Sequence, residues 1–484
     1  MSVNTSLWTC SELNDVFASN LIDAGVVTGV SIDTRALKAG DLFIALKGPN
    51  FNANDFLEEA NQKGAIYFIA DEASKIPAHL KERTILVADS LKALQKLAEA
   101  ARARTKARVV AITGSVGKTS TKNLVTTVLK DQALTYGSIG NFNNDIGLPL
   151  NLSRLPRNAE IAIFEMGMNH KGEIDFLSRL ARPDVAIITN VEAVHLEFFE
   201  SVTGIAEAKA EIFHGMKEGG FAILNIDNSY FALLHQRAME KGLQVKTFGT
   251  THLADAYLEK ANILPDKTEM IVRMAGKEYV YDFLMPGAHL VLNSLAALLV
   301  LDVLSLDVLL GIKALEHVAP AEGRGLEINL PGNIAVIDDC YNAGPVSMRG
   351  SLAHFSHLPG KRRIAILGDM LELGDQGPNL HRDLREVITS KVDRIYCCGP
   401  LMQGLYEELP VSQKGAYAKT ADELWDQVKN DIHEGDVFLL KASAGMKLKL
   451  LREKLIQFIK MTYNQDDRTQ SSTSSLKVTA NHVL

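Results

Sequence analysis

The stretch RVVAITGSVGKTSTKNLVTTVLKDQ, residues 108–132, decides the fold of this 484-residue chain. Its first six residues form a largely apolar run typical of a buried strand, and residues 119–132 have the composition of a helix. A short turn with two glycines, Gly114 and Gly117, separates them. A strand that leads through such a turn into a helix begins a βαβ unit, so the stretch predicts a parallel sheet covered by helices.

The same turn has the chemistry of a phosphate-binding loop. Gly114 and Gly117 let backbone N–H groups point at phosphate oxygens, the following helix adds partial positive charge, and Lys118 neutralises terminal phosphates. The hydroxyl of Thr119 is placed to hold Mg²⁺. The loop departs from the GxxxxGK[ST] pattern because Ile112 stands where the first glycine would be. Despite this departure, the glycine turn between a strand and a helix, together with Lys118, predicts a site for the phosphates of a nucleotide.

Outward from this turn, strand-like and helix-like segments alternate along most of the chain. A helix-forming run with an Asp-Ser start, residues 89–104, precedes the central stretch. The apolar runs that we expect to form strands are 41–46, 65–70, 84–88, 161–164, 185–189, 221–225, 333–337, 363–367, 394–398 and 436–440. This alternation is typical of doubly wound parallel sheets.

The chain is longer than one hydrophobic core usually organises, which suggests several domains. We predict an α/β protein with a small N-terminal α/β domain over residues 1–87 and a central parallel-sheet domain with the phosphate loop over 88–318. A Rossmann-like α/β domain is expected over 319–464. Residues 465–484 are polar and of low complexity, so we predict a disordered tail.

Composition limits the classes of function. The chain carries 51 Lys and Arg against 58 Asp and Glu, and this net charge of −7 argues against a nucleic acid partner. Its four cysteines show no CxxC spacing, which favours a reducing compartment. The N-terminus does not resemble a signal peptide, and the most apolar stretch, residues 290–306, is too short and polar to span a membrane. We expect a water-soluble cytoplasmic protein in which residues 290–306 form a buried helix.

Three further residues are candidates for chemistry, each with a plainer alternative. Glu165 ends an apolar run, where an α/β sheet places its ligands, but a carboxylate in a surface turn is equally consistent. His195 follows another such run by a short loop, and a structural histidine is the simpler interpretation. Lys209 lies between Glu207 and Glu211 in a helix-like segment, where the local sequence favours an ordinary solvated lysine.

Nine ordered blocks, which extend over nearly the whole chain, resemble the motifs of the Mur ligase family. They are SIDTRALKAGDLFIALKG (31–48), TGSVGKTSTK (113–122), GNFNNDIGLPL (140–150), FEMGMNHKGEI (164–174), ITNVEAVHLEFF (188–199), EAKAEIF (207–213), GRGLEI (323–328), DDCYNAGPVSM (338–348) and LGDMLELGD (367–375). The combination of DDCYNA with LGDMLELG is most similar to the branch of this bacterial, cytoplasmic family that adds D-alanyl-D-alanine.

The resemblance implies an ATP-dependent, ADP-forming ligase of peptidoglycan precursor synthesis. It would add D-alanyl-D-alanine to UDP-N-acetylmuramoyl-tripeptide through an acyl phosphate. The first domain would bind the UDP substrate, the second ATP and the third the dipeptide, in a chain expected to be a monomer. Open alternatives are a sister ligase that adds a single amino acid, a folylpolyglutamate-type ligase, a nucleotide-regulated binding module and a P-loop kinase.

The resemblance also assigns roles to individual residues. The ATP phosphates would bind at Thr113, Gly114, Ser115, Val116, Gly117, Lys118 and Thr119, with Asn293 at the adenine, Arg324 at the γ-phosphate and Asp339 at the ribose. Two Mg²⁺ sites would use Thr119, Glu165, His195 and a carbamylated Lys209, and the catalytic set would be Lys118, Glu165, His195 and Lys209. Substrate contacts would come from Asp33 and Arg35 for the uridine nucleotide, Asn141, Asn143 and Asn144 for the muramoyl group, and Tyr341, Asn342 and Lys441 for the dipeptide.

A few positions depart from the family motifs. Leu290 replaces the first asparagine of HNxxN, which removes one polar adenine contact. Gly344 replaces the second asparagine of YNANP, and Ala444 replaces the arginine of KGSRG. In the first domain, NANDF at residues 52–56 stands where the family has DGHDF. The loop lysine and the expected metal ligands are all retained.

Overall fold

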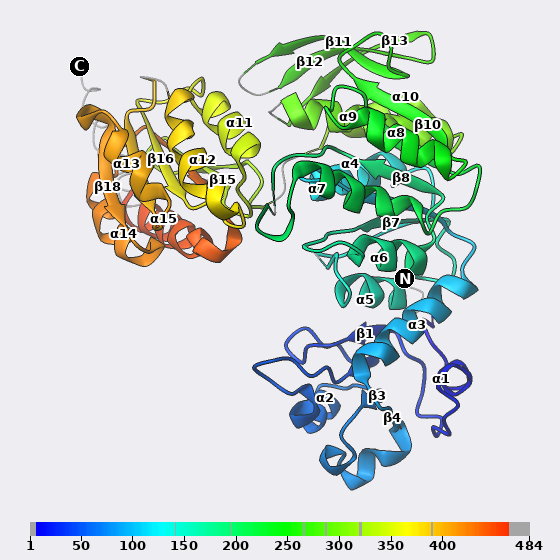
Figure 1. The fold of residues 1–484 in the computed structure, drawn as a ribbon. Helices are drawn as coiled ribbons and strands as arrows, with labels where there is room; N and C mark the ends of the chain where they lie inside the picture. The colour runs from blue at the N-terminus through cyan, green and yellow to red at the C-terminus, as the bar shows by residue number, and fades with distance from the viewer. Residues whose placement is uncertain are drawn as a thin grey trace, which may run out of the picture.

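The computed structural model describes residues 6–140, 142–194, 196–264, 267–285, 288–318, 322–388 and 391–463. Three sheets follow one another along the chain and carry helices on their faces (Figure 1). The predicted three-part α/β architecture is confirmed. The exact domain boundaries stay predictions, and the predicted tail at 465–484 lies outside the described residues.

The N-terminal unit is a four-stranded parallel sheet. Its strands, in sheet order, are β1 (Gly29–Ser31), β2 (Asp41–Ile44), β3 (Tyr67–Ala70) and β4 (Thr84–Leu86), and its helices are α1 (Cys10–Phe17) and α2 (Leu57–Gln62). Every residue of β2 and β3 is buried, as expected for apolar runs in a sheet covered on both faces.

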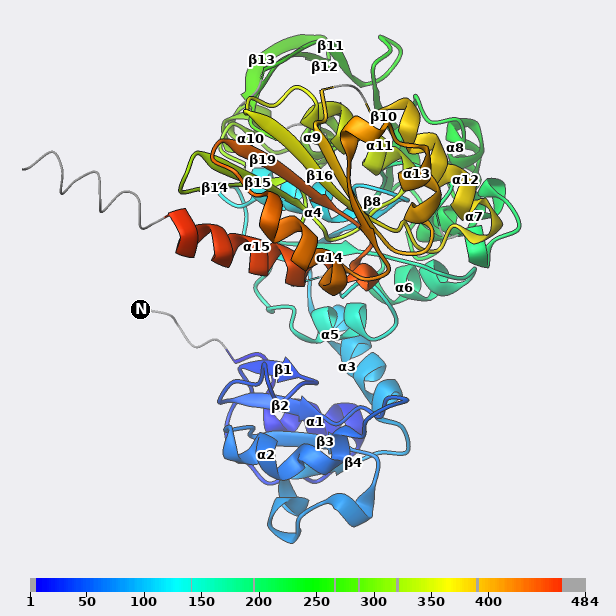
Figure 2. The same ribbon diagram turned by 90° about the vertical axis from the view of Figure 1, so that its left-hand side faces the viewer.

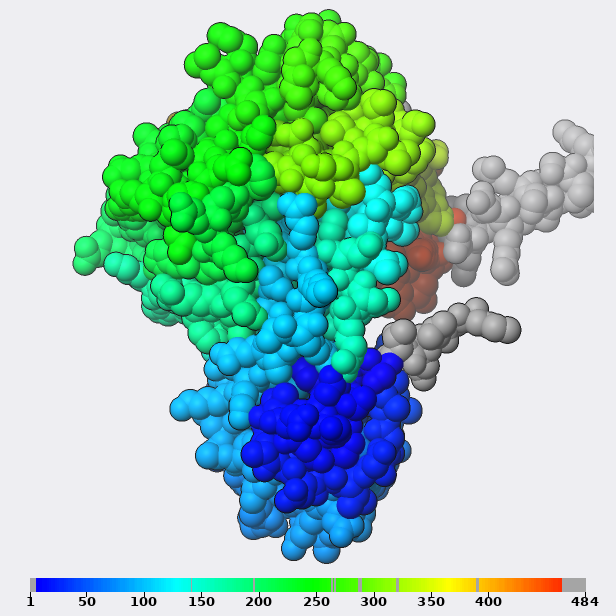
Figure 3. All heavy atoms as spheres, turned by 90° about the vertical axis from the view of Figure 1, so that its right-hand side faces the viewer, coloured from blue at the N-terminus to red at the C-terminus, as the bar shows by residue number. Residues whose placement is uncertain are grey.

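Helix α3 (Ser90–Arg104) joins this unit to the next one. Asp89 caps the helix by accepting a hydrogen bond from the Lys92 backbone N–H at 2.9 Å, which fits the predicted Asp-Ser start. Leu94 and Leu97 pack in the core of the N-terminal unit, whereas Ala98 packs in the core of the central unit. Figures 2 and 3 show the N-terminal unit, in blue, attached below the other two through this helix.

The central unit is built on a nine-stranded sheet in the order β13-β12-β11-β10-β9-β8-β5-β7-β6. Its strands are β5 (Arg108–Thr113), β6 (Thr135–Gly137), β7 (Ile161–Glu165), β8 (Val185–Ile188), β9 (Phe221–Asn225), β10 (Gln244–Gly249), β11 (Ala256–Ile263), β12 (Thr268–Met274) and β13 (Lys277–Phe283). Its helices are α4 (Lys118–Leu129), α5 (Gly147–Ser153), α6 (Glu173–Ala181), α7 (Val202–Ala210), α8 (Phe231–Glu240), α9 (Ala288–Val303) and α10 (Val308–Leu315).

Strand β5 lies inside the parallel part of this sheet, between β7 and β8. The chain leaves β5 toward β6 and β7 on one side and later reaches β8 and β9 on the other. The carboxyl end of β5 is therefore the switch point at which doubly wound sheets bind their ligands. The predicted phosphate loop begins at this end.

Strands β11, β12 and β13 add an antiparallel edge that the prediction of a parallel sheet did not include. The turn between β12 and β13 has positive φ at both central residues, Ala275 and Gly276. An Asn-Gly or Asp-Gly pair is the usual sequence signal of such a turn, and Ala-Gly does not give it. The hairpin was therefore missed.

The predicted buried helix at 290–306 is α9, which ends at Val303. Its leucines pack with strands β10 and β11 in one core cluster, while α6 and α7 lie on the other face of the sheet. Within the described residues, no helix is long and apolar enough to cross a membrane.

The C-terminal unit has a six-stranded sheet in the order β14-β15-β19-β16-β17-β18. Its strands are β14 (Leu326–Leu330), β15 (Ile334–Asp339), β16 (Arg362–Gly368), β17 (Arg394–Cys398), β18 (Lys414–Ala418) and β19 (Asp436–Lys441). Its helices are α11 (Pro345–Phe355), α12 (Gly377–Arg382), α13 (Met402–Glu408), α14 (Ala421–Val428) and α15 (Leu448–Tyr463). The edge strands β14 and β18 were not predicted, because edge strands are half exposed and lack a continuous apolar run.

Candidate functional site

The phosphate loop turns sharply between β5 and α4. Gly114 has φ +148°, and a Cβ there would lie 1.9 Å from the Thr189 hydroxyl oxygen. Gly117 has φ +87° and directly precedes α4, with the Asn293 amide nitrogen 2.6 Å from the position of a Cβ. Both positions therefore require glycine, for backbone conformation and for space.

Residues that follow β8 hold the loop in place. The backbone N–H of Ser115 donates to the Asn190 carbonyl, and that of Val116 donates to the Asn190 side-chain oxygen, both at 3.0 Å. The Thr189 hydroxyl donates to the Val116 carbonyl at 2.6 Å. The sequence analysis did not identify Thr189 and Asn190 as site residues. The signal that could have identified them is their position just after β8, a strand that neighbours β5.

Lys118 is the half-buried cation of the loop. Its ammonium donates to the Gly114 carbonyl at 2.8 Å. Burial lowers the pKa of Lys118, and the Glu165 carboxylate opposes that shift. A desolvated ammonium at the start of a helix is suited to neutralise phosphate oxygens.

Glu165 lies at the carboxyl end of β7, as predicted, and is only 3% exposed. Its carboxylate accepts hydrogen bonds from the Thr119 hydroxyl at 2.7 Å and from the Asn143 amide at 2.8 Å. The alternative of a carboxylate in a surface turn is therefore wrong. Asn144, by contrast with Asn143, does not bond to Glu165: its side-chain oxygen accepts the backbone N–H of Gly147 at the start of α5. Two further predicted residues, Asn141 and His195, lie outside the described residues.

Lys209 contradicts the interpretation that its local sequence favoured. It is 2% exposed, while Glu207 pairs with Arg237 and Glu211 accepts the backbone N–H of Gly172. Among the described residues, its ammonium makes no hydrogen bond or ion pair. Burial, together with repulsion from Lys118, holds the pKa of Lys209 well below its ordinary value. Tertiary packing, which the helix periodicity does not reveal, buries this side chain.

The C-terminal unit reaches the phosphate loop through Arg324. Its guanidinium donates to the Thr119 hydroxyl at 2.8 Å and lies 4.3 Å from the centre of the Tyr341 ring. Asp339 and Lys441 end the neighbouring strands β15 and β19 and form a buried ion pair at 2.7 Å. The structure thus brings predicted residues from two units to one place.

A cavity of about 430 Å³ lies between the two units. The residues on its wall include Lys118, Thr119, Glu165, Arg324, Asp339, Tyr341, Asn342 and Lys441. Three of the departures from the family motifs, Leu290, Gly344 and Ala444, also line it. A second cavity of about 510 Å³ shares Asn143 with the first and includes Asn144.

Asp33, Arg35 and Asn293 are among the predicted residues that do not line the main cavity. Asp33 and Arg35 form an ion pair at 2.7 Å on the N-terminal unit, where the Arg35 side chain is 87% exposed. Asn293 lies on α9 against Gly117, and its side chain is buried.

The oxygen donors at the site fit Mg²⁺ by their chemistry. The Thr119 hydroxyl and the Glu165 carboxylate meet beside the phosphate loop, and hard divalent cations prefer such oxygen ligands. Within the described part of the chain, no group of three or more His, Cys, Asp or Glu side chains could hold a metal by itself. Phosphate oxygens of a bound nucleotide would add to these two ligands.

Comparison with known proteins gives three family matches along the chain. The Mur ligase family, catalytic domain, matches residues 26–102, the Mur ligase middle domain matches 112–301, and the Mur ligase, glutamate ligase domain, matches 324–444. The chain is 38% identical over 442 residues to the UDP-N-acetylmuramoyl-tripeptide–D-alanyl-D-alanine ligase of Bacillus subtilis (strain 168). That alignment covers 89% of this chain and 94% of the relative.

Two solved structures have the same architecture over nearly their whole length. MurF from Acinetobacter baumannii superposes with a TM-score of 0.81 at 28% identity and covers 93% of this chain and 99% of its own. The MurF ligase from Thermotoga maritima in complex with ADP gives a TM-score of 0.76 at 27% identity, with 90% and 98% covered.

Proposed function

This chain belongs to the Mur ligase family, and from that premise we propose how its site works. It is an ATP-dependent, ADP-forming ligase that joins D-alanyl-D-alanine to UDP-N-acetylmuramoyl-tripeptide. The observation that carries the mechanism is the single cavity in which Lys118 and Glu165 of the central unit face Arg324 and Asp339 of the C-terminal unit.

The reaction must first activate a carboxylate, which is by itself a poor acylating agent. The terminal carboxylate of the tripeptide attacks the γ-phosphate of ATP, so an acyl phosphate forms and ADP leaves. The amine of D-alanyl-D-alanine then adds to the acyl carbon, and phosphate departs. Lys118 would offset the repulsion between the two anionic substrates, and Arg324 would stabilise charge on the phosphoryl group in transfer.

We propose that Thr119, Glu165, His195 and a carbamate on Lys209 hold two Mg²⁺ ions. When bound, the ions would add positive charge between the phosphates and the substrate carboxylate. The hydrogen-bonded pair of Thr119 and Glu165 supports this proposal, because their oxygens already converge beside the phosphate loop.

The carbamate proposal rests on the unusual environment of Lys209. An amine must be neutral to form a bond to the carbon of CO₂, and a proton leaves as the carbamate forms. The lowered pKa of Lys209, caused by burial and by Lys118, increases the share of the neutral amine. Two ammonium groups, those of Lys209 and Lys118, repel each other. A carbamate on Lys209 is an anion, so it would attract the Lys118 ammonium.

The remaining contacts follow from the family resemblance and, for the residues that line the cavity, also from their place on its wall. We propose that the loop Thr113–Thr119 and Asn293 hold ATP, with Asp339 at the ribose. Asn141, Asn143 and Asn144 would contact the muramoyl group, and Asp33 with Arg35 the uridine nucleotide. Tyr341, Asn342 and Lys441 would contact the dipeptide. The reaction would take place in the bacterial cytoplasm.

An amine panel tests the function directly. Phosphate release and product mass are measured with UDP-N-acetylmuramoyl-tripeptide, ATP and one candidate amine at a time. We expect release that depends on D-alanyl-D-alanine and a product heavier by the dipeptide minus water. Dependence on a single amino acid would instead favour a sister ligase, and dependence on glutamate with a folate acceptor would favour a folylpolyglutamate-type ligase.

A further inference from the structure

The turn that brings Arg324 to the site is held by side chains to which the proposed function assigns no role. Arg324 stands between two glycines, Gly323 with φ +75° and Gly325 with φ +84°. Glycine has the most backbone freedom of any residue, so a Gly-Arg-Gly turn does not hold one conformation by itself. Bonds from other parts of the chain must therefore fix the position of Arg324.

Asp338 supplies such bonds on both sides of Arg324. Its carboxylate accepts the backbone N–H of Gly323 at 2.8 Å, and its backbone carbonyl accepts that of Gly325, also at 2.8 Å. Tyr341, whose ring lies against the Arg324 guanidinium, donates its backbone N–H to the Gly323 carbonyl at 3.1 Å. These bonds tie the turn to the carboxyl end of β15.

The Asp338 side chain is fully buried, and a buried carboxylate needs a positive partner and further hydrogen bonds. Arg452 of α15 is that partner and is itself only 6% exposed. The Cys340 thiol also donates to Asp338, at 2.8 Å. A second nitrogen of the Arg452 guanidinium donates to the carboxylate of Glu322, the residue directly before the turn, at 2.9 Å. Arg452 therefore holds the turn from two points.

The group that this turn delivers to the site is the Arg324 guanidinium, which donates to the Thr119 hydroxyl of the phosphate loop. A group that stabilises charge in a transition state must be in place before the reaction begins. A misplacement of about 1 Å can lower a rate by about a hundredfold. The ion pair behind the turn can therefore affect a step whose reacting atoms it does not touch.

We propose that the buried ion pair of Asp338 and Arg452 positions Arg324 for transfer of the phosphoryl group. Both are positioning residues, because they bond to the turn and to the residue before it and do not line the main cavity. The inference rests on the proposed function, in which Arg324 stabilises that phosphoryl group. Loss of the pair should lower kcat and leave nucleotide binding nearly unchanged.

The first test is Arg452→Met, which removes the guanidinium and keeps a long side chain. We expect kcat to fall about ten- to a hundredfold, the effect of misplacing a catalytic group. The KM for ATP and the Kd for ADP should stay within about threefold, because the N–H groups of the phosphate loop are unchanged. Steady-state kinetics and calorimetry with ADP measure these quantities.

Two further variants keep the test independent of stability. Arg452→Met leaves the Asp338 carboxylate buried without its cation, which destabilises the fold. The double variant Asp338→Leu/Arg452→Met replaces the pair by apolar side chains, a change that folds often tolerate, and it should lose kcat all the same. In Arg452→Lys a compact ammonium replaces the two-armed guanidinium, so its kcat should lie between those of Arg452→Met and the wild type. Circular dichroism establishes that each variant is folded at the assay temperature.

A double-mutant cycle with Arg324→Ala separates positioning from a general loss of structure. If the pair acts through Arg324, then Arg452→Met should change kcat by less than about twofold once Arg324 is absent. A disturbance that spreads through the C-terminal unit would lower kcat by the same factor in both backgrounds. The matched control is Lys449→Met: Lys449 lies on the same helix and pairs with the same Glu322 at 3.3 Å, but it is 59% exposed. Its kcat should match the wild type.

The inference is overturned if kcat of folded Arg452→Met stays within about twofold of the wild type, or if it falls equally with and without Arg324. A rise confined to the KM for ATP also overturns it and would make the pair part of the nucleotide site. A wild-type kcat in Arg324→Ala would contradict the proposed role of Arg324, and the inference would fall with it. A failure of the proposed function itself is seen separately, in a wild type that releases no phosphate in response to D-alanyl-D-alanine.

Discussion

Lys122 and Lys209 are buried in the central unit, and burial of an ammonium is costly unless the group is neutral or well bonded. Lys209 makes no bond among the described residues, which suits a side chain that changes its chemical form. Lys122 instead donates to the carbonyls of Ser138 and Gly140, both at 3.0 Å. Lys122 therefore fixes the loop that places the Asn143 side chain beside Glu165.

Lys122→Met should disturb that loop. The substitution leaves two carbonyls without their donor, which we expect to cost about 1–3 kcal/mol of unfolding free energy. Because Asn143 and Asn144 lie beyond the anchored carbonyls, kcat/KM for UDP-N-acetylmuramoyl-tripeptide should fall at least about tenfold, the effect of about 1.4 kcal/mol. Steady-state kinetics and thermal unfolding measure the two effects.

The control for this change is Lys130→Met. Lys130 is exposed at the end of the same helix, so its loss should leave both quantities nearly unchanged. Equal kinetic constants for Lys122→Met and the wild type would show that the loop keeps its place without the lysine.

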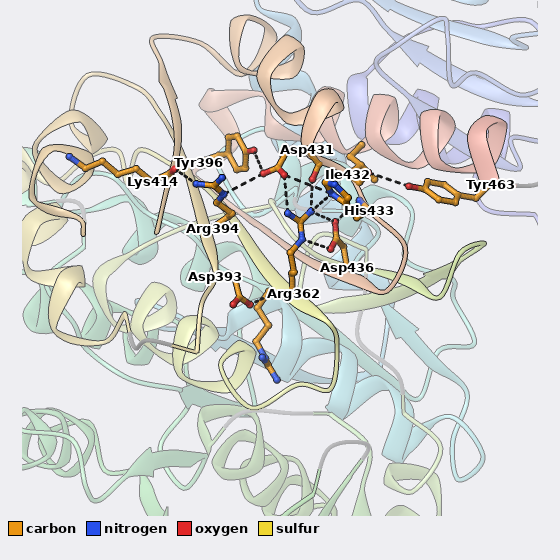
Figure 4. A network of polar contacts seen from close by, with 11 residues as sticks. Arg362, Asp393, Arg394, Tyr396, Lys414, Asp431, Ile432, His433, Asp436 and Tyr463 are labelled. Atoms are coloured by element: carbon orange, nitrogen blue, oxygen red, sulfur yellow. Dashed lines mark hydrogen bonds and ion pairs between the residues drawn. The ribbon is translucent and has the colours of Figure 1, made fainter. Parts of the chain in front are cut away.

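At the scale of the elements, a network of charged side chains lies at the amino ends of the parallel strands β16, β17 and β19 of the C-terminal unit (Figure 4). Arg362, which begins β16, donates to Asp431 at 2.9 Å and to both oxygens of Asp436 at 2.9 and 2.7 Å. The Tyr396 hydroxyl donates to Asp431 at 2.7 Å. This network links β16, β17 and β19 at the end opposite to the loops that line the cavity.

The network should make the C-terminal unit sensitive to acid. Burial tends to raise the pKa of Asp431, but the hydrogen bonds from Arg362 and Tyr396 outweigh it and lower the pKa. A lowered pKa in the folded state gives stability that is present above the unfolded value, about 4, and is lost as pH falls below it. Asp431→Asn should therefore lower the unfolding free energy by about 1–3 kcal/mol at pH 7.

The difference between Asp431→Asn and the wild type should shrink as pH falls below about 4, because the carboxyl is then protonated first in the unfolded state and, at lower pH, in the folded state. Thermal unfolding followed across pH measures this. Asp426→Asn removes an exposed carboxylate paired with Lys429 and should have little effect at any pH. A pH-independent difference for Asp431→Asn would mean that its charge does not contribute.

On the scale of the whole molecule, the side chain of Arg324 connects the C-terminal unit to the phosphate loop. The Arg324 guanidinium bonds to Thr119, and Val194 of the central unit comes within 3.4 Å of where a Cβ on Gly344 would lie. The catalytic cavity exists only where the two units meet. Its chemistry therefore depends on their docking.

Arg324→Ala should separate catalysis from nucleotide binding. If Arg324 stabilises the phosphoryl group in transfer, kcat should fall at least about a hundredfold, because such arginines contribute about 10³–10⁵ in rate. ADP should still bind within about threefold, since the loop N–H groups remain. Rapid kinetics and calorimetry with ADP measure the two quantities.

Arg349→Ala is the control, because Arg349 pairs with Glu386 inside the C-terminal unit and does not reach the central one. Its kcat should match the wild type. A loss of ADP binding in Arg324→Ala as large as its loss of kcat would instead make Arg324 a ground-state contact.

The sequence allowed some residues to be placed correctly and misplaced others for a physical reason. Gly114 to Thr119 and Glu165 were located because a strand end and a glycine turn are local features. Lys209 was judged exposed from its neighbours Glu207 and Glu211, yet those carboxylates turn to Arg237 and Gly172. Helix periodicity does not say which side chains tertiary packing will bury.

By itself, the sequence determined the three-part α/β architecture and the phosphate loop, because strand–turn–helix order depends on neighbouring residues. Only the tertiary structure decided that Arg324 meets Thr119 from 205 positions away and that Lys441 pairs with Asp339 from 102 positions away. It also decided that Arg452 pairs with Asp338 from 114 positions away. Such contacts depend on how whole units pack, and no local pattern of residues encodes that packing.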